Sequence, residues 1–137
     1  MTLATPEPEM LAAAARIARF METLDDGALE GVFADHVTII ENFAPHIFAG
    51  DCAVARWAAG FRAHAAGISN LKHAFGAPQD YAVQDDLAFF TLPTTWTGTS
   101  HGAKFSEQGG WAFVFVRQNN RWRIQGYGWA VTATSEE

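Results

Sequence analysis

Cysteine is nearly absent from this sequence, because Cys52 is the only one among its 137 residues. A lone cysteine cannot form a disulfide within the chain, so the composition fits a protein of a reducing compartment. Free cysteine usually behaves as a small apolar residue. We therefore expect Cys52, near the start of a predicted helix, to be buried rather than reactive.

Positive charge and long apolar runs are scarce as well. Nine lysines and arginines stand against fifteen acidic residues, and they are scattered along the chain. This distribution argues against a surface that follows a phosphate backbone, so no nucleic acid partner is expected. No stretch approaches the roughly 20 apolar residues of a membrane span, and the N-terminus lacks a basic segment followed by an apolar run. We expect a cytoplasmic protein with no membrane partner.

The spacing of the histidines also lacks the patterns of metal sites. None of the five histidines stands four residues from another, as in zinc proteases, or two residues from another, as in cupins. Such spacings place two imidazoles on one face of a helix or strand, where they can share an ion. The sequence predicts neither a metal nor another cofactor.

Apolar and aromatic residues are plentiful, at 49% and 13% of the chain, and residues 1–137 are predicted to form one domain. Two aromatic and β-branched runs, residues 111–117 and 122–131, flank Asn119-Asn120, which predicts an antiparallel hairpin. Alternate residues of a strand point to opposite faces of the sheet, and in the first run both sets are apolar. Neither face of the sheet can therefore be left to water. We expect a homodimer through the outer sheet face.

Helical signals fill the first half. Thr5 followed by Pro6 predicts a helix start, and apolar residues recur every three or four positions from Met10 to Leu24. Asp25-Asp26-Gly27 predicts the end of that helix and the cap of a short second one. Asp51 is predicted to cap a third helix.

Strand signals surround the third helix. Residues 37–42 predict a first strand with Glu41 at its far end. After the helix, extended segments are expected over residues 71–84, 87–97 and 104–117, with a bulge at Gly109-Gly110. Helices followed by strands of this kind indicate an α+β fold, with the helices on one face of an antiparallel sheet.

Several strings carry a resemblance to a known superfamily. They are residues 24–27, residues 29–38, Gly50 before the third helix and residues 120–124. The chain resembles the cone-shaped α+β superfamily named after nuclear transport factor two, whose enzymes include SnoaL-like polyketide cyclases, ketosteroid isomerases and scytalone dehydratase. The resemblance implies a curved antiparallel sheet wrapped around N-terminal helices, with an internal pocket and an outer face that pairs with a second subunit.

Glu41 is the first candidate that the resemblance implies. It stands where the ketosteroid isomerases place their general-base carboxylate, and a carboxylate in an apolar pocket has a raised pKa suited to proton exchange. The alternative is a solvated glutamate at a strand end. The isomerases' two oxyanion donors correspond to Phe20 and a position near Ala112, which cannot donate through their side chains, so steroid-type isomerisation is disfavoured.

Asp25 and His73 form the second candidate group. Scytalone dehydratase is similar in having an aspartate at the end of the first helix and a histidine early in the strand after the third. A histidine oriented by a carboxylate can move the proton that elimination of water requires. The dehydratase's second histidine has no match, Thr94 being the nearest position. The alternatives are a helix-cap role for Asp25 and an exposed strand position for His73.

Aromatic residues complete the predicted site. The side chains expected to contact a small apolar or aromatic ligand are Phe20, His46, Trp57, Phe90, Tyr127 and Trp129. The first interpretation is a lyase- or isomerase-type enzyme that acts through Glu41, His73 and Asp25. The alternative is a non-catalytic ligand-binding or dimerisation module of the same fold.

Overall fold

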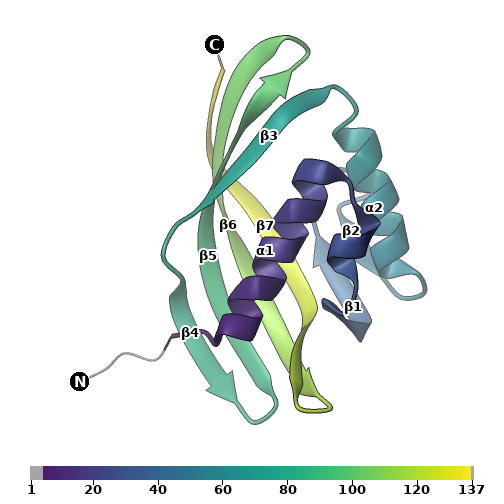
Figure 1. The fold of residues 1–137 in the computed structure, drawn as a ribbon, viewed down its shortest axis with the longest axis vertical. Coiled ribbons are helices and arrows are strands. Elements are labelled where there is room, and N and C mark those ends of the chain that lie inside the picture. The colour runs from purple at the N-terminus through teal and green to yellow at the C-terminus, as the bar shows by residue number, and fades with distance from the viewer. Residues whose placement is uncertain (1–4, 137) are drawn as a thin grey trace.

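The structure is a computed structural model that describes residues 5–136 (Figure 1). In chain order the elements are α1 (Pro8–Thr23), the 3-10 turn η1 (Asp26–Leu29), β1 (Phe33–Ile40), β2 (Ile47–Ala49), α2 (Ala53–His64), β3 (Ile68–Phe75), β4 (Gln79–Gln84), β5 (Leu87–Ser100), β6 (Ala103–Gln118) and β7 (Arg121–Glu136). Neither α-helix combines the length and the hydropathy that a membrane span requires.

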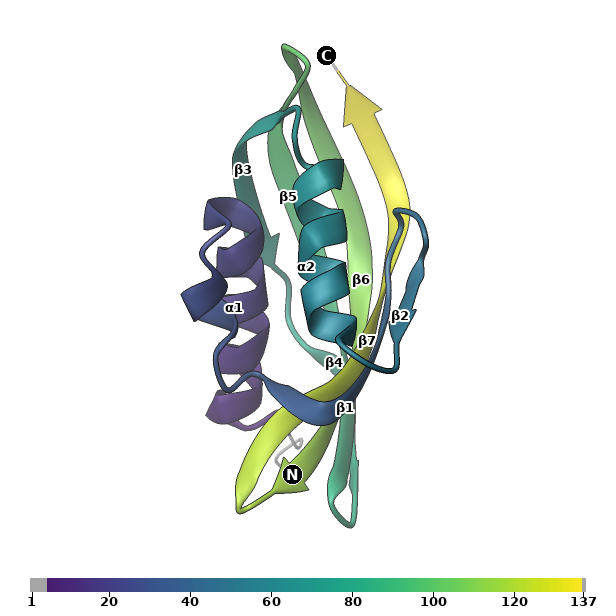
Figure 2. The same ribbon diagram turned by 90° about the vertical axis from the view of Figure 1, so that its right-hand side faces the viewer.

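The strands form one seven-stranded sheet in the order β2-β1-β7-β6-β5-β3, with β4 paired to β5. Strand β1 runs parallel to β7, and all other pairs are antiparallel. Both helices lie on one face of this curved sheet (Figure 2). The predicted α+β cone is confirmed, although the sheet is mixed and not purely antiparallel.

Helix α1 begins later than its sequence signals predicted. Its N-cap is Glu7, in an extended conformation, and Pro8 occupies the first turn; the predicted cap at Thr5 is wrong. The reason is local, because a residue that precedes proline is disfavoured in the helical region, and Glu7 precedes Pro8. The apolar spacing from Met10 to Met21 forms the buried face as predicted.

Helix α2 also begins differently. Its N-cap is Cys52 in the left-handed conformation, without a side-chain cap, so the predicted cap at Asp51 is wrong. Cys52 is exposed, which corrects the expectation that it is buried. The Arg56 guanidinium instead secures this entrance by donating to the backbone oxygens of Asp51 and Ala49.

The β6–β7 hairpin contains a tight turn and a bulge. Its turn residues Asn119 and Asn120 both have positive φ, as the sequence predicted for a tight hairpin. The pairing shifts register between Gln108 and Gly109, so the predicted bulge is confirmed. A side chain at Gly109 would collide with the Ala130 backbone oxygen, at 2.2 Å, which explains glycine at this close approach.

Alternation along β6 separates the two faces of the sheet. Trp111, Phe113 and Phe115 are buried beneath the helices, whereas Ala112 is exposed on the opposite face. At the ends of β1 and β5, Ile40 and Leu87 are about half exposed, at 49% and 47%. The outer face therefore carries apolar surface that the two helices do not cover.

Candidate functional site

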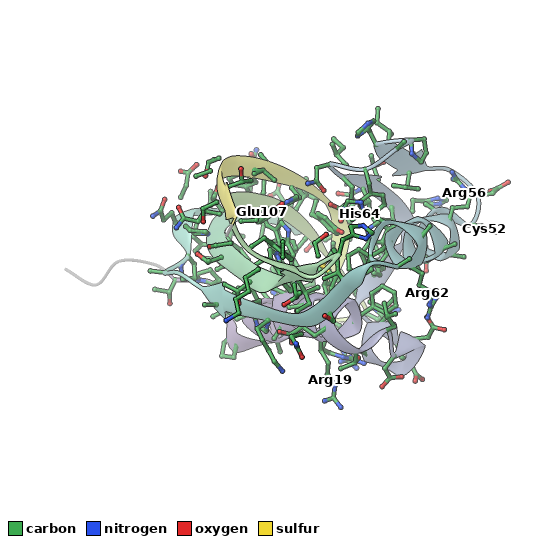
Figure 3. The ribbon with its side chains drawn as sticks, turned by 90° about the horizontal axis from the view of Figure 1, so that it is seen from above. Arg19, Cys52, Arg56, Arg62, His64 and Glu107 are labelled. Atoms are coloured by element: carbon green, nitrogen blue, oxygen red, sulfur yellow. The ribbon has the colours of Figure 1, made fainter. Side chains whose placement is uncertain are left out.

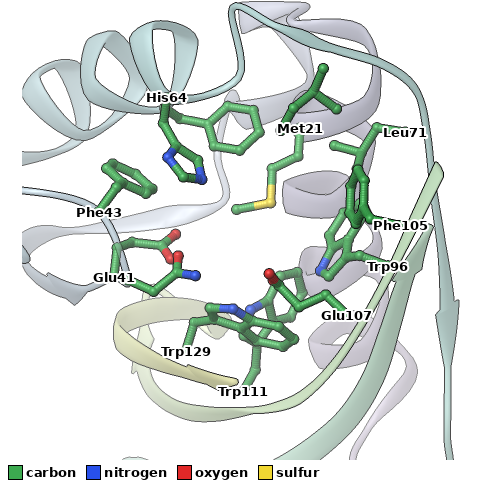
Figure 4. Close-up of a pocket in the computed structure, with 13 residues that line it drawn as sticks. Met21, Glu41, Phe43, His64, Leu71, Trp96, Phe105, Glu107, Trp111 and Trp129 are labelled. Atoms are coloured by element: carbon green, nitrogen blue, oxygen red, sulfur yellow. The ribbon is translucent and has the colours of Figure 1, made fainter. Parts of the chain in front are cut away.

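A cavity opens between the sheet and the ends of the two helices (Figure 4). Its free volume is about 70 Å³, small beside the roughly 300–1,000 Å³ of typical ligand pockets. Its lining is mainly aromatic, with two glutamates, one histidine and one asparagine. The lining residues are Met21, Glu41, Asn42, Phe43, Phe61, His64, Ile68, Leu71, Trp96, Phe105, Glu107, Trp111 and Trp129.

Glu41 lies at the inner end of this cavity because of strand alternation. Ile39 is buried and Ile40 points outward, so the next residue turns inward, where its exposure is 4%. The following loop fixes its backbone. The Glu41 N–H donates to the backbone oxygen of His46 at 2.8 Å, and Nδ1 of His46 lies 2.9 Å from the backbone oxygen of Glu41. His46 therefore holds the Glu41 backbone and does not line the cavity.

One oxygen of the Glu41 carboxyl group receives two side-chain donors. The indole N–H of Trp57, on α2, donates to Oε2 at 3.0 Å, and the hydroxyl of Tyr127, on β7, donates to the same atom. Oε1 has no side-chain donor among residues 5–136, and no buried side-chain polar atom of those residues lacks a partner. Oε1 is thus the oxygen free of side-chain donors, and the Asn42 backbone is the remaining donor to this carboxyl group.

Burial raises the pKa of Glu41 above its ordinary value of 4.5, and the hydrogen bonds from Tyr127, Trp57 and the Asn42 backbone offset only part of the shift. Burial and the adjacent Glu41 charge raise the pKa of Tyr127 well above 10, so the phenol keeps its proton and remains a donor. Because both side-chain donors occupy Oε2, Oε1 is the oxygen at which neutral Glu41 can hold its proton without losing either bond. The group can carry a proton at the cavity surface.

A second carboxyl group faces the same cavity. Glu107, on β6, is half-buried, and burial raises its pKa, with the Trp129 side chain and His64 acting in the opposite direction. His64 is the exposed last residue of α2, and its ring stacks on Phe43 with centroids 4.9 Å apart. The close-up shows Glu41, Glu107 and His64 converging from three elements (Figure 4).

Three indoles form the cavity wall opposite the helices. The ring centroids of Trp96 and Trp111 are 6.2 Å apart with planes inclined by 58°, and those of Trp111 and Trp129 are 5.7 Å apart at 73°. These are tilted and edge-to-face packing contacts rather than parallel stacks, and all three rings also line the cavity. The arginines that Figure 3 labels point outward, away from this wall.

The predicted ligand-contacting aromatics divide into two groups. Trp129 lines the cavity, while Trp57 and Tyr127 hold its carboxyl group. Phe20 packs on Trp57 with centroids 5.3 Å apart and is fully buried, and Phe90 is buried against Phe113 at 5.5 Å. Phe20 and Phe90 therefore belong to the core and do not line the cavity.

The predicted Asp25–His73 pair does not form. Oε2 of Glu22 lies 2.9 Å from His73 Nδ1 and accepts the His73 backbone N–H at the same distance. Helix α1 ends at Thr23, so Glu22 still faces the sheet, whereas Asp25 lies beyond the end. The Asp25 side chain accepts from the Gly27 N–H at 2.9 Å and caps η1, the alternative role that the sequence suggested.

Sequence reasoning placed neither Glu107 nor His64 in the site. One signal was available: Glu107 has the same parity along β6 as Phe105 and Trp111, all of which line the cavity. No comparable signal exists for His64, because its position depends on how α2 docks. Among residues 5–136, no three histidine, cysteine or acidic side chains are grouped to hold a metal ion.

Comparison with known proteins places the fold. No protein-family model matches this sequence, and neither does any curated protein. Among solved structures, the hexachlorocyclohexane dehydrochlorinase LinA-type3 of Novosphingobium barchaimii superposes with a TM-score of 0.81 at 8% identity, over 94% of this chain and 88% of that one. An NTF2-like superfamily protein of Salmonella enterica superposes with a TM-score of 0.72 at 15% identity, over 88% of this chain and 87% of that one.

A protein named as a scytalone dehydratase, from Novosphingobium aromaticivorans, gives a TM-score of 0.71 at 12% identity, over 94% of this chain and 87% of that one. The cone, the helices on its inner face and the cavity at their ends thus define a pocket-bearing α+β protein. More particularly, the chain has the NTF2-like fold, as the sequence resemblance implied. Proteins of this fold include a dehydrochlorinase and a dehydratase by name, which are lyase names.

Proposed function

We propose that the cavity binds a small molecule and that Glu41 exchanges a proton with it, in a cofactor-free reaction of the lyase or isomerase type. The observation that carries this proposal is the asymmetric bonding of the Glu41 carboxyl group. Trp57 and Tyr127 occupy Oε2, while Oε1 is left for a ligand. A fixed, desolvated carboxyl group with a raised pKa suits both removal and return of a proton near neutral pH.

The chemistry follows from this arrangement. Oε1 of the Glu41 carboxylate takes a proton from a carbon of the ligand, and the released electron pair forms a double bond to the neighbouring carbon. In an elimination, the leaving group departs with the former bonding pair and takes a proton from Glu107 or His64. In an isomerisation, Glu41 returns its proton to a different carbon. The aromatic lining favours a flat apolar ligand body.

Isotope exchange tests this proposal. Small cyclic enolisable compounds are incubated with the protein in D₂O, and loss of the acidic C–H signal is followed by NMR. Exchange should slow by roughly 100-fold or more in Glu41→Gln, the usual scale for a general base. Glu30→Gln, which removes an exposed glutamate outside the cavity, is the control and should leave the rate unchanged.

The second candidate is a ligand-binding module without catalysis, and one observation favours it. Phe20 is buried and apolar, and Ala112 lies on the outer face, so neither position supplies the oxyanion donor that an isomerase of this fold would place there. A ligand that binds with equal affinity to wild type and Glu41→Gln, and that is not turned over by either, would support this candidate over the enzyme.

A further inference from the structure

The cavity combines two acids with an aromatic wall and lacks a strong cation. None of its lining residues is lysine or arginine. Glu41 is 4% exposed, and its Oε1 has no side-chain donor among the described residues. A nearly buried carboxyl group without a cationic partner is costly in its charged form. A bound cation would therefore stabilise the ionised form of Glu41, which has no lysine or arginine partner among the lining residues.

The second acid stands directly beside the indoles. Glu107 is the cross-strand partner of Trp96 in the β5–β6 pairing, and Trp111 is the partner of Trp129 in the β6–β7 pairing. The acid and three indole rings thus project from the same face of three adjacent strands. Figure 4 shows the Glu41 and Glu107 side chains directed toward the space above Trp111 and Trp129.

Indole faces carry negative electrostatic potential and attract organic cations within about 6 Å of the ring centre. All three indoles line this cavity, with neighbouring rings inclined by 58° and 73°. A neutral aromatic ligand would gain from these rings but would not stabilise the ionised form of either carboxyl group. A cation gains from the rings and the carboxyl groups together.

We propose that the ligand of this cavity is a small organic cation, a substituted ammonium ion held against Trp96, Trp111 and Trp129 and between Glu41 and Glu107. This assignment rests on the proposed function only in taking the cavity as the ligand site. The small free volume, about 70 Å³, favours a compact cationic group such as trimethylammonium as the part of the ligand that enters this cavity.

The titratable groups facing the cavity predict the direction of the pH effect. They are Glu41 beside Tyr127, and Glu107 facing His64. Both carboxyl groups bind a cation best when ionised, and both have pKa values raised above 4.5. The affinity for a permanently charged ammonium should therefore increase as the pH rises above that value. A neutral ligand that accepts hydrogen bonds from the protonated acids would show the opposite dependence.

Choline and its uncharged isostere 3,3-dimethylbutan-1-ol are suitable probes, because they differ in charge but hardly in shape. Binding is measured by calorimetry and by quenching of tryptophan fluorescence between about pH 5 and about pH 8. We expect choline to bind roughly tenfold tighter than the alcohol at neutral pH, with a smaller difference at the acidic end.

Glu107→Gln should weaken choline binding roughly tenfold and leave the alcohol within about twofold, whereas Glu30→Gln should change neither. Circular dichroism verifies that each variant is folded. If the alcohol binds as tightly as choline, or if choline binding weakens with rising pH, the cationic assignment is overturned while the cavity remains a ligand site. If neither probe binds, the cationic assignment fails, and the D₂O exchange experiment decides the proposed function separately.

Discussion

The hydroxyl of Tyr127 donates a hydrogen bond to Oε2 of Glu41, across 86 positions of sequence. The contact follows from the parallel pairing of β1 with β7, in which Ile39 is opposite Tyr127 and Ile40 is opposite Gly128. Glu41 comes directly after this pairing, so its side chain reaches back to the phenol beneath α2. The end of β1 is thereby fixed to the centre of β7.

Tyr127→Phe is expected to destabilise the protein by about 2 kcal/mol near neutral pH, because a buried hydrogen bond to a carboxyl group is lost. It should also raise the pKa of Glu41 further, since one of the donors that favours the charged form disappears. Urea unfolding measures the first effect. Tyr81→Phe is the matched control, because Tyr81 is only partly buried; equal losses in the two variants would contradict the account.

The effect of Glu41→Gln on stability should depend on pH. A carboxyl group with a raised pKa binds its proton more tightly in the folded state. Its contribution to stability is therefore fully present below the pKa of the unfolded state and is lost as the pH rises through the pKa of the folded state. Glutamine has no such loss. The free energy of unfolding of Glu41→Gln, relative to wild type, should therefore increase from about pH 4 toward neutral pH; a constant difference would contradict the raised pKa.

Asp25 should matter for folding more than for ligand binding. Asp25→Ala removes the acceptor for the Gly27 N–H and is expected to cost about 1 kcal/mol, whereas Asp25→Asn retains an acceptor and should cost less. Denaturation of the two variants measures this difference. Impaired ligand binding or turnover by a fully stable Asp25→Asn would show that the aspartate has a role beyond the cap.

The outer sheet face should mediate a homodimer. It presents Ala112 and Val114, with Ile40 at the end of β1 and Leu87 at the start of β5, and the helices cover only the opposite face. Sedimentation at micromolar concentration should show twice the chain mass of 14.9 kDa, and Val114→Glu should reduce the mass to that of one chain. A wild-type protein that sediments only as a monomer would rule the dimer out.

The fold could be predicted from the sequence because its signals are local. The apolar spacing after Met10, the paired asparagines before Arg121 and the double glycine at Gly109-Gly110 each specify one element or turn, and the structure has each of them. Helix starts were less accurate. The proline that decides the start of α1 is Pro8 rather than Pro6. The N-cap of α2 is Cys52 rather than Asp51, and its side chain makes no capping hydrogen bond.

The site could be predicted only where strand alternation determined it. Glu41 follows a β-branched run, and its inward direction is a matter of parity. The partner of His73 could not be predicted in this way, because Glu22 and Asp25 are both near the end of α1 and only the position of the helix end separates them. His64 faces the cavity through the docking of α2, which depends on the whole core.

The most direct test of the account is the titration of Glu41 itself. The side-chain carboxyl carbon of each glutamate is followed by NMR as a function of pH, and Glu41→Gln identifies the signal that belongs to residue 41. We predict a midpoint clearly above 4.5 for Glu41, and a further increase in Tyr127→Phe. A Glu41 midpoint at 4.5 or below, unchanged in Tyr127→Phe, would contradict the proton-carrying role assigned to this residue.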